Sequence, residues 1–255
     1  MKSKVLIKLF LATVVGLCVV FSAAAQTTGT VYDNSSNDQG SNLILTNNQI
    51  IGVEILPDAT AASSYPYLWS FSFELYGANA GHYWTFSGAV QGDVSFYLNT
   101  GVGGSPASTP FYNSGWFSVN MPDPLLSNIG VGTIGFAWQD IYSSTLPGAL
   151  NMPTTLTLPN DFTVVFSFSG LDVAGGDVLG LANFQPQTLG TNYGDYWSWN
   201  GNSWDDISVL STNSTPTSVG MQFVGSATEA PEPSTLALGA LGGLLMTHLL
   251  RRRKV

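Results

Sequence analysis

Apolar and polar side chains alternate along several short segments of the chain. The pattern is found in segments 68–76, 94–98, 117–121, 162–169 and 219–223. A period of two, carried by aromatic and β-branched residues, is typical of half-buried β-strands. In the first segment, one predicted face consists of Trp69, Phe71, Phe73 and Leu75, and the other of Ser70, Ser72 and Glu74. In the second, Val94, Phe96 and Leu98 share a face, while Ser95 and Tyr97 lie opposite.

Clusters of Gly, Pro, Asn, Asp and Ser separate these segments and indicate turns. They occupy 57–64, 101–110, 123–128, 147–153 and 213–216. Between the two ends of the chain, no stretch has helical periodicity over three turns, and no repeat of fixed period is visible. We therefore expect about ten to twelve strands in an all-β, antiparallel β-sandwich of the jelly-roll type, covering residues 26–228.

The charges are few and unevenly placed. Only 9% of the 255 residues are charged, and no Lys or Arg occurs between Leu9 and Leu250. The body of the chain, residues 26–230, nevertheless carries fifteen acids, twelve Asp and three Glu. Nucleic-acid binding is excluded because it requires cations that neutralise phosphates. Acid–Lys or acid–Arg ion pairs cannot form inside the body, so apolar burial and hydrogen bonds must stabilise it.

The N-terminus, residues 1–25, has the form of a secretory signal peptide. Lys2, Lys4 and Lys8 precede an apolar run at 9–21, and Ala23 and Ala25 form a small-residue cleavage site. This predicts export through the Sec machinery. The single cysteine lies in the apolar run, so cleavage leaves a mature chain without disulfides.

The C-terminus has three parts. Residues 231–235 are Pro-Glu-Pro-Ser-Thr, residues 236–250 are almost all apolar, and residues 251–254 are Arg-Arg-Arg-Lys. The apolar part predicts a single transmembrane helix, and the basic tail is expected to stay cytoplasmic by the positive-inside rule. This order places the acidic body outside the inner membrane.

Together these three parts resemble the PEP-CTERM sorting signal of Gram-negative bacteria. The resemblance covers residues 229–255 and includes all three parts in the right order. It implies an exosortase that processes the chain near Pro231, Glu232 and Pro233, after transient anchoring in the inner membrane. It also implies release to the cell surface or to an exopolysaccharide matrix. An ordinary single-pass anchor that is never cut remains the alternative.

Catalytic chemistry has few candidate residues. His82 is the only histidine of the body, so a Ser-His-Asp triad would have to use it. One His and no Cys leave a zinc site short of ligands. Glycoside hydrolysis needs two carboxylates, and the body offers Glu54, Glu74 and Glu229 besides its aspartates. Glu74 lies on the polar side of its segment and is expected to be solvated. We expect no enzymatic activity.

Aspartates suggest a calcium site more than any other metal site, because hard cations prefer oxygen ligands. The candidate ligands are Asp33, Asp38, Asp205 and Asp206. None of the segments matches an EF-hand loop. Solvated Asx turns give the same composition without a metal, so calcium stays open and no other cofactor is expected.

The densest aromatic cluster lies at residues 193–206. Asn200-Gly201 is a hairpin signal that would bring Trp199 and Trp204 together across two strands. Trp197 and Trp199 share a face. These rings are candidates for stacking on a glycan, with Asp or Asn binding its hydroxyls. The alternative is cross-strand aromatic packing over the sandwich core.

The sequence thus favours an exported, non-enzymatic protein of the cell surface or extracellular matrix, associated with exopolysaccharide. A carbohydrate-binding module is the second hypothesis, and a secreted glycoside hydrolase or lyase ranks below both.

Overall fold

The computed structural model describes residues 27–79, 82–83, 85–101, 104–119, 131–137, 156–192, 196–207 and 218–229. The strands belong to one compact unit, Thr28–Glu229. The predicted signal peptide with Ala23 and Ala25, the processing motif at Pro231, Glu232 and Pro233, and the predicted helix 236–250 lie outside the described residues. Within the part described, no helix has the length and apolar character needed to cross a membrane.

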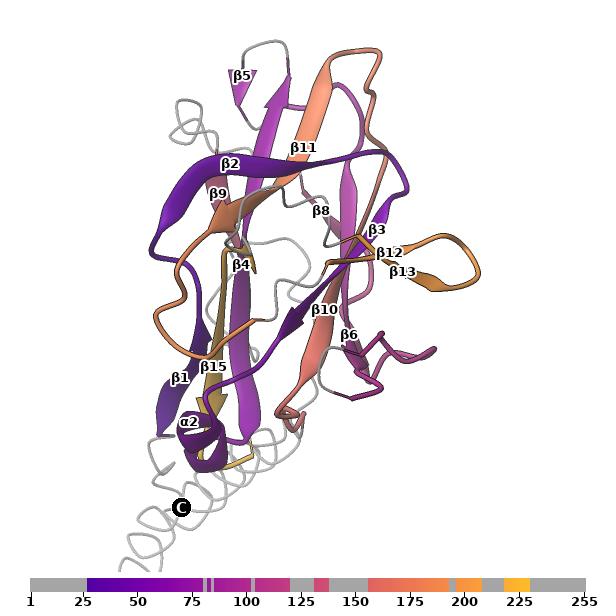
Figure 1. Ribbon diagram of the computed structural model, residues 1–255. Coiled ribbons are helices and arrows are strands. Elements are labelled where there is room, and N and C mark those ends of the chain that lie inside the picture. Colours follow the sequence, from indigo (N-terminus) through magenta and orange to yellow (C-terminus); the bar gives the residue numbers. More distant parts are fainter. Residues whose placement is uncertain are drawn as a thin grey trace, which may run out of the picture. The chain divides into compact units, whose positions relative to one another are not determined.

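The fold is all-β and sandwich-like, as the alternation predicts, with two antiparallel sheets (Figure 1). The first sheet contains β1 (Thr28–Asp33), β2 (Asp38–Leu45), β4 (Tyr67–Asn79), β5 (His82–Tyr83), β9 (Val131–Ala137), β11 (Asp177–Phe184), β14 (Ser218–Val219) and β15 (Met221–Ser226). The second contains β3 (Ile50–Ile55), β6 (Gln91–Leu98), β7 (Tyr112–Asn113), β8 (Phe117–Ser118), β10 (Phe162–Ser169), β12 (Tyr196–Trp199) and β13 (Trp204–Asp206).

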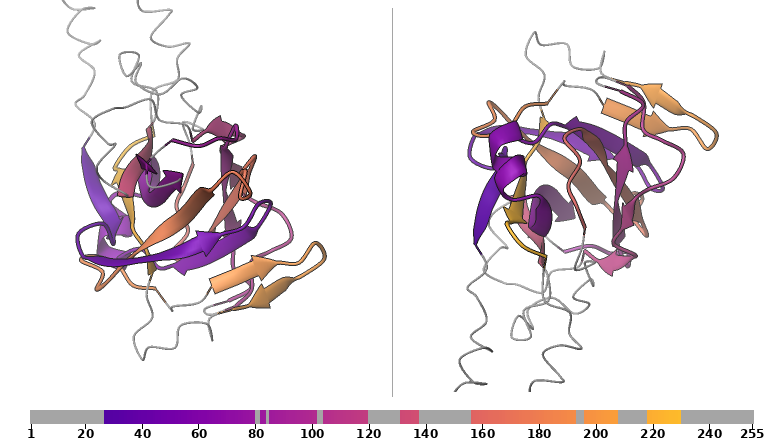
Figure 2. Two further views of the ribbon diagram at one scale, coloured as in Figure 1. Left: turned by 90° about the horizontal axis from the view of Figure 1, so that it is seen from above. Right: turned by 90° about the horizontal axis from the view of Figure 1, so that it is seen from below.

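Strands that follow one another along the chain lie mostly in different sheets. In the first sheet β2, β11, β4 and β9 are neighbours in that order, and in the second β3, β10, β6 and β7 are. Along the chain, β2, β3, β4 and β6 alternate between the two sheets, and β9, β10 and β11 alternate again. The hairpin β12–β13 extends the second sheet beyond β3 and stands out at its side (Figure 2).

Aromatic rings from both sheets form the core between them. Phe71 of β4 meets Phe96 of β6 edge-on, with ring centroids 5.0 Å apart, and Phe73 meets Phe166 of β10 at 4.9 Å. Phe223 of β15 lies 5.6 Å from Phe96. Each fully buried Phe stabilises the fold by roughly 1.5–3 kcal/mol, so these rings hold the two sheets face to face.

The predicted alternation fails at two positions. Trp69 does not join Phe71 on the core face, because the register shift opposite Val224 and Gly225 makes Trp69 the extra residue of a bulge, and Leu68 is buried in its place. Leu98, the last residue of β6, is 49% exposed. Alternation therefore gives the correct core face in the middle of these strands and fails at a bulge and a strand end.

Two elements differ from the sequence prediction. The described residues form fifteen strands rather than ten to twelve, because two-residue strands such as β5 and β7 are too short to show a period. Part of the predicted turn 57–64 is a helix, α2 (Ala59–Ser64), which Asp58 caps by accepting a hydrogen bond from the Ala61 backbone N–H at 2.8 Å.

The buried carboxylate of Asp177 joins three segments at one end of the sandwich. Its Oδ1 accepts hydrogen bonds from Asn79 Nδ2 at 2.5 Å and from the Ser87 backbone N–H at 2.8 Å, and its Oδ2 accepts from the N–H groups of Gly88 and Asp172. Burial by itself raises the pKa of Asp177, but these hydrogen bonds outweigh it, and the pKa lies well below the usual range of an aspartate.

We expect Asp177→Asn to lower the free energy of unfolding by roughly 2 kcal/mol at pH 7, because the amide turns a donor toward backbone N–H groups that lose their acceptor. Since the folded-state pKa is lowered, Asp177 stabilises the fold above the pKa of an unfolded aspartate, about 4, and this contribution is lost as the pH falls below it. Urea unfolding followed by circular dichroism would measure this at pH 7 and pH 3. The difference in the free energy of unfolding between wild type and Asp177→Asn should be smaller at pH 3 than at pH 7.

A matched control is Asp38→Asn. The carboxylate of Asp38 is exposed and accepts a single described hydrogen bond, from the Gly40 backbone N–H. Its replacement should change stability little at either pH. An Asp177→Asn difference that stays constant from pH 7 to pH 3 would contradict the assignment.

Candidate glycan-binding site

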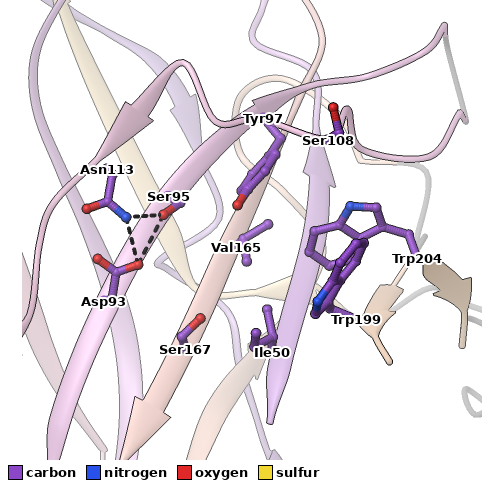
Figure 3. A pocket seen from close by; sticks show the side chains of 10 residues that line it. All are labelled: Ile50, Asp93, Ser95, Tyr97, Ser108, Asn113, Val165, Ser167, Trp199 and Trp204. Carbon is purple, nitrogen blue, oxygen red and sulfur yellow. Dashed lines mark hydrogen bonds between the residues drawn. The ribbon is translucent and has the colours of Figure 1, made fainter. Parts of the chain in front are cut away.

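A shallow, open pocket of about 160 Å³ lies on the outer face of the second sheet (Figure 3). Its lining comes from β3, β6, β7, β10 and the hairpin β12–β13, with one residue from the loop after β6. The lining residues are Ile50, Asp93, Ser95, Tyr97, Ser108, Asn113, Val165, Ser167, Trp199 and Trp204. Side chains on the opposite side of the same strands, such as Phe96 and Phe166, lie in the core, so the pocket rests on a packed sheet.

One wall of the pocket is aromatic. Trp199 and Trp204 pair directly across the hairpin, with ring centroids 5.2 Å apart and planes tilted by 58°, and both are half-buried. The turn between them is held by Asn200, whose Oδ1 accepts from the backbone N–H groups of Asn202 and Ser203 at 2.9 Å, and by Gly201 at φ 97°. The predicted hairpin, with the two rings together, is confirmed.

Tyr97 extends the aromatic wall toward the middle of the sheet. Its ring meets that of Trp204 edge-on at a centroid distance of 5.7 Å. Burial raises the pKa of Tyr97, and the negative charge of Asp93 raises it further. The phenol therefore keeps its proton at neutral pH and can donate a hydrogen bond.

The opposite wall is polar. Asp93 Oδ2 accepts hydrogen bonds at 3.0 Å from Ser95 Oγ and from Asn113 Nδ2, and Asn113 Nδ2 also lies 2.7 Å from Ser95 Oγ. Asp93 is 9% exposed, so its carboxylate is fixed rather than free to rotate. Figure 3 shows this polar group facing the two indoles across Val165 and Ser167. Chemically, the arrangement offers flat apolar rings on one side and oriented hydroxyl and amide groups on the other.

The floor between the walls is formed by β3 and β10. Val165 of β10 lies at the centre, with Ser167 on the same strand and Ile50 on β3. From β6 to β12 there are three inter-strand steps, which span ~14 Å at the usual spacing. A site of this width suits a flat, polar molecule with apolar faces.

Trp197 is not part of this pocket. Although it shares a face with Trp199, it is only 7% exposed and pairs with Gly52, where an added Cβ would lie 2.7 Å from Thr163 Cγ2. The absence of a side chain at Gly52 lets Trp197 and Thr163 pack over β3. The predicted stacking role for Trp197 is therefore wrong, whereas Trp199 and Trp204 remain available. Trp197 packs across β12 and β3 on the outer face of the second sheet, and not over the sandwich core as the alternative from the sequence would have it.

The calcium candidates do not come together. Asp33 Oδ1 accepts from the Ser35 N–H and hydroxyl, and Asp38 Oδ1 from the Gly40 N–H, so both form turns. Asp205 Oδ2 accepts from Asn200 Nδ2 at 2.9 Å, and Asp206 pairs with Trp197 across the hairpin. Among the described residues there is no group of three or more His, Cys, Asp or Glu side chains that could hold a metal ion.

The glutamates considered for hydrolysis are far from one another. Glu54 is buried on the outer side of the second sheet, and Glu74 is on the first sheet, on the side facing away from the core. Glu74 is partly buried rather than solvated: burial raises its pKa, and Thr133 Oγ1 donates to both of its oxygens. His82 and Glu229 are exposed. Because the core separates Glu54 from Glu74, these two cannot act as one catalytic pair.

Comparison of the chain with known protein families, with curated proteins and with solved structures gives no match. The function must therefore be argued from the pocket itself.

We expect Gly201→Ala to destabilise the protein by roughly 1–2 kcal/mol, because an L side chain is strained at this positive φ. The strain should also loosen the hairpin and reduce the near-ultraviolet circular dichroism of the Trp199–Trp204 pair. Gly40→Ala is the matched control: it too has positive φ and open space around an added Cβ, but it lies on β2. It should cost similar stability and leave the tryptophan signal unchanged. If Gly201→Ala and Gly40→Ala had equal near-ultraviolet signals, the turn at Gly201 would not be what holds the Trp199–Trp204 pair.

Proposed function

We propose that this chain is an exported, non-enzymatic protein of the cell surface or extracellular matrix that binds neutral polysaccharide in the pocket of its second sheet. The observation that carries the proposal is the pair Trp199 and Trp204 facing the hydrogen-bonded group of Asp93, Ser95 and Asn113. The pocket thus supports the carbohydrate-binding hypothesis and the proposed association with exopolysaccharide.

Sugar chemistry fits the two walls. The C–H faces of a pyranose ring are apolar and flat enough to lie on an indole, while its hydroxyls need donors and acceptors at the ring edge. Tyr97 and Ser108 supply hydroxyls, and Asn113 and Asp93 supply amide and carboxylate groups. Since the carboxylate of Asp93 is held by Ser95 and Asn113, little side-chain entropy is lost when a ligand binds.

The charge of the body selects the class of glycan. With fifteen acids between residues 26 and 230, and no Lys or Arg between residues 9 and 250, the chain cannot pair with the carboxylates of an acidic polysaccharide. Asp93 in the polar wall repels them directly. A neutral hexose polymer is therefore the ligand class, and binding should depend little on salt concentration.

Export and sorting complete the proposal. Residues 1–25 direct the chain to the Sec machinery, and the PEP-CTERM-like segment 229–255 anchors it transiently in the inner membrane until an exosortase acts near Pro231, Glu232 and Pro233. Release then places the body among exopolysaccharide chains. No cofactor, metal or nucleic acid has a part in this function.

We expect Trp199→Ala to weaken binding to neutral glycans at least tenfold, because the stacking surface is removed. The full chain in mild detergent would be tested on immobilised neutral glucans, mannans and xylans. Ile44→Ala removes another exposed apolar side chain, 51% exposed on the other sheet, and should bind as wild type.

Polyuronates provide the contrasting arm of the same assay. Wild type should bind them at background level, both at low and at physiological salt. Binding to polyuronate alone, or wild-type affinity in Trp199→Ala with the fold intact, would overturn the proposal.

We expect the exported protein to lack both ends. Mass spectrometry of the protein recovered from the cell surface or medium should find a chain that begins at Gln26 and ends near residues 231–233, because both processing steps precede release. The intact 255-residue chain in the cytosol would contradict the proposed route.

A further inference from the structure

The loop between β7 and β8 carries an exposed tryptophan at the edge of the second sheet opposite the β12–β13 hairpin. Trp116 is 56% exposed, more than any other tryptophan the structure describes. Both β7 and β8 pair with β6, the strand that supplies Asp93 and Ser95 to the pocket. The polar wall therefore lies between Trp116 on one side and Trp199 with Trp204 on the other.

Trp116 directly precedes β8, and the alternation of that strand predicts that Trp116 lies on the pocket side of the sheet. Phe117 pairs with Gly92 and packs against the core, so residues 116 and 118 on either side of it are expected on the outer face. Ser95 and Asn113, which pair with each other across β6 and β7, belong to that same face because both line the pocket.

The loop that presents Trp116 is fixed by hydrogen bonds. Ser114 Oγ accepts from the Val94 N–H at 2.9 Å, and the Ser114 N–H donates to the Val94 carbonyl at 2.8 Å. Asn113 Oδ1 accepts from the Gly115 N–H at 2.8 Å, while its Nδ2 holds Asp93. Asn113 thus connects the polar wall to the loop of Trp116, and the backbone that carries the indole is held by hydrogen bonds before any ligand arrives.

We propose that Trp116 forms a second stacking subsite, so that the site binds an extended segment of a neutral glycan chain that runs across the strands. From β12 to β8 there are four inter-strand steps, or ~19 Å, which is longer than a single sugar ring. A chain laid in this direction stacks on Trp199 and Trp204 at one edge, meets Asp93, Ser95 and Asn113 in the middle, and stacks on Trp116 at the other edge. This inference rests on the glycan-binding function proposed above.

The test is the dependence of affinity on ligand length. Calorimetry on the full chain in mild detergent would use cello-, laminari-, manno- and xylo-oligosaccharides, each from the disaccharide to the hexasaccharide. For the series that binds, wild-type affinity should rise with length. Trp116→Ala should bind the disaccharide as wild type does and lose about tenfold in affinity for the hexasaccharide, whereas Trp199→Ala should lose affinity for both.

Two further variants separate stacking from general effects. Trp116→Phe keeps a flat ring and should retain most of the affinity for the hexasaccharide. Leu98→Ala removes another exposed apolar side chain of the same sheet, on β6, and should leave affinity unchanged at every length.

Each remaining outcome is decisive. If Trp199→Ala abolishes binding while Trp116→Ala keeps wild-type affinity for the hexasaccharide, the second subsite is refuted and the glycan-binding function stands. If no oligosaccharide binds, or neither variant changes affinity, the function fails and the subsite with it.

Discussion

The structure depends on aromatic packing between two sheets, because the body lacks the cations with which its acids would form ion pairs. Phe71, Phe73, Phe96, Phe166 and Phe223 meet across the sandwich at centroid distances between 4.9 and 5.6 Å. Backbone ladders and this apolar contact supply the stability that other proteins gain partly from charge. The outer face of the second sheet is a firm surface because its inner face is packed in this way.

The same lack of cations determines how the acids are held. Asp177 is stabilised by one amide and several backbone N–H groups, and Asp93 by a hydroxyl and an amide. Neutral donors of this kind leave the negative charge uncompensated, in contrast to a Lys or Arg partner. A pocket built in this way presents oriented acceptors and a negative potential, and both properties support the proposal of a hydroxyl-rich, uncharged ligand.

Local patterns in the sequence predicted what depends on neighbouring residues, and failed where distant segments meet. The central core positions and the Trp199–Trp204 hairpin follow from alternation and from Asn200-Gly201. The polar wall could not be found, because Asn113 reaches Asp93 only through the pairing of β7 with β6, and no local signal encodes that register. Trp197 was misassigned for a related reason: its burial depends on Gly52 of β3, which lies far away in the sequence.

Short strands close both edges of the second sheet, and the same short strands carry its exposed indoles. Sheet edges invite aggregation unless they are kept short or irregular, and here one edge ends in the three-residue β13 and the other in the two-residue β7 and β8. The loops between such strands lie at the edge of the sheet, and here hydrogen bonds of Asn113, Ser114 and Asn200 hold them. The elongated ligand site that we propose thus rests on how this sandwich ends its sheet, with a packed floor in the middle and exposed or half-buried indoles near both edges.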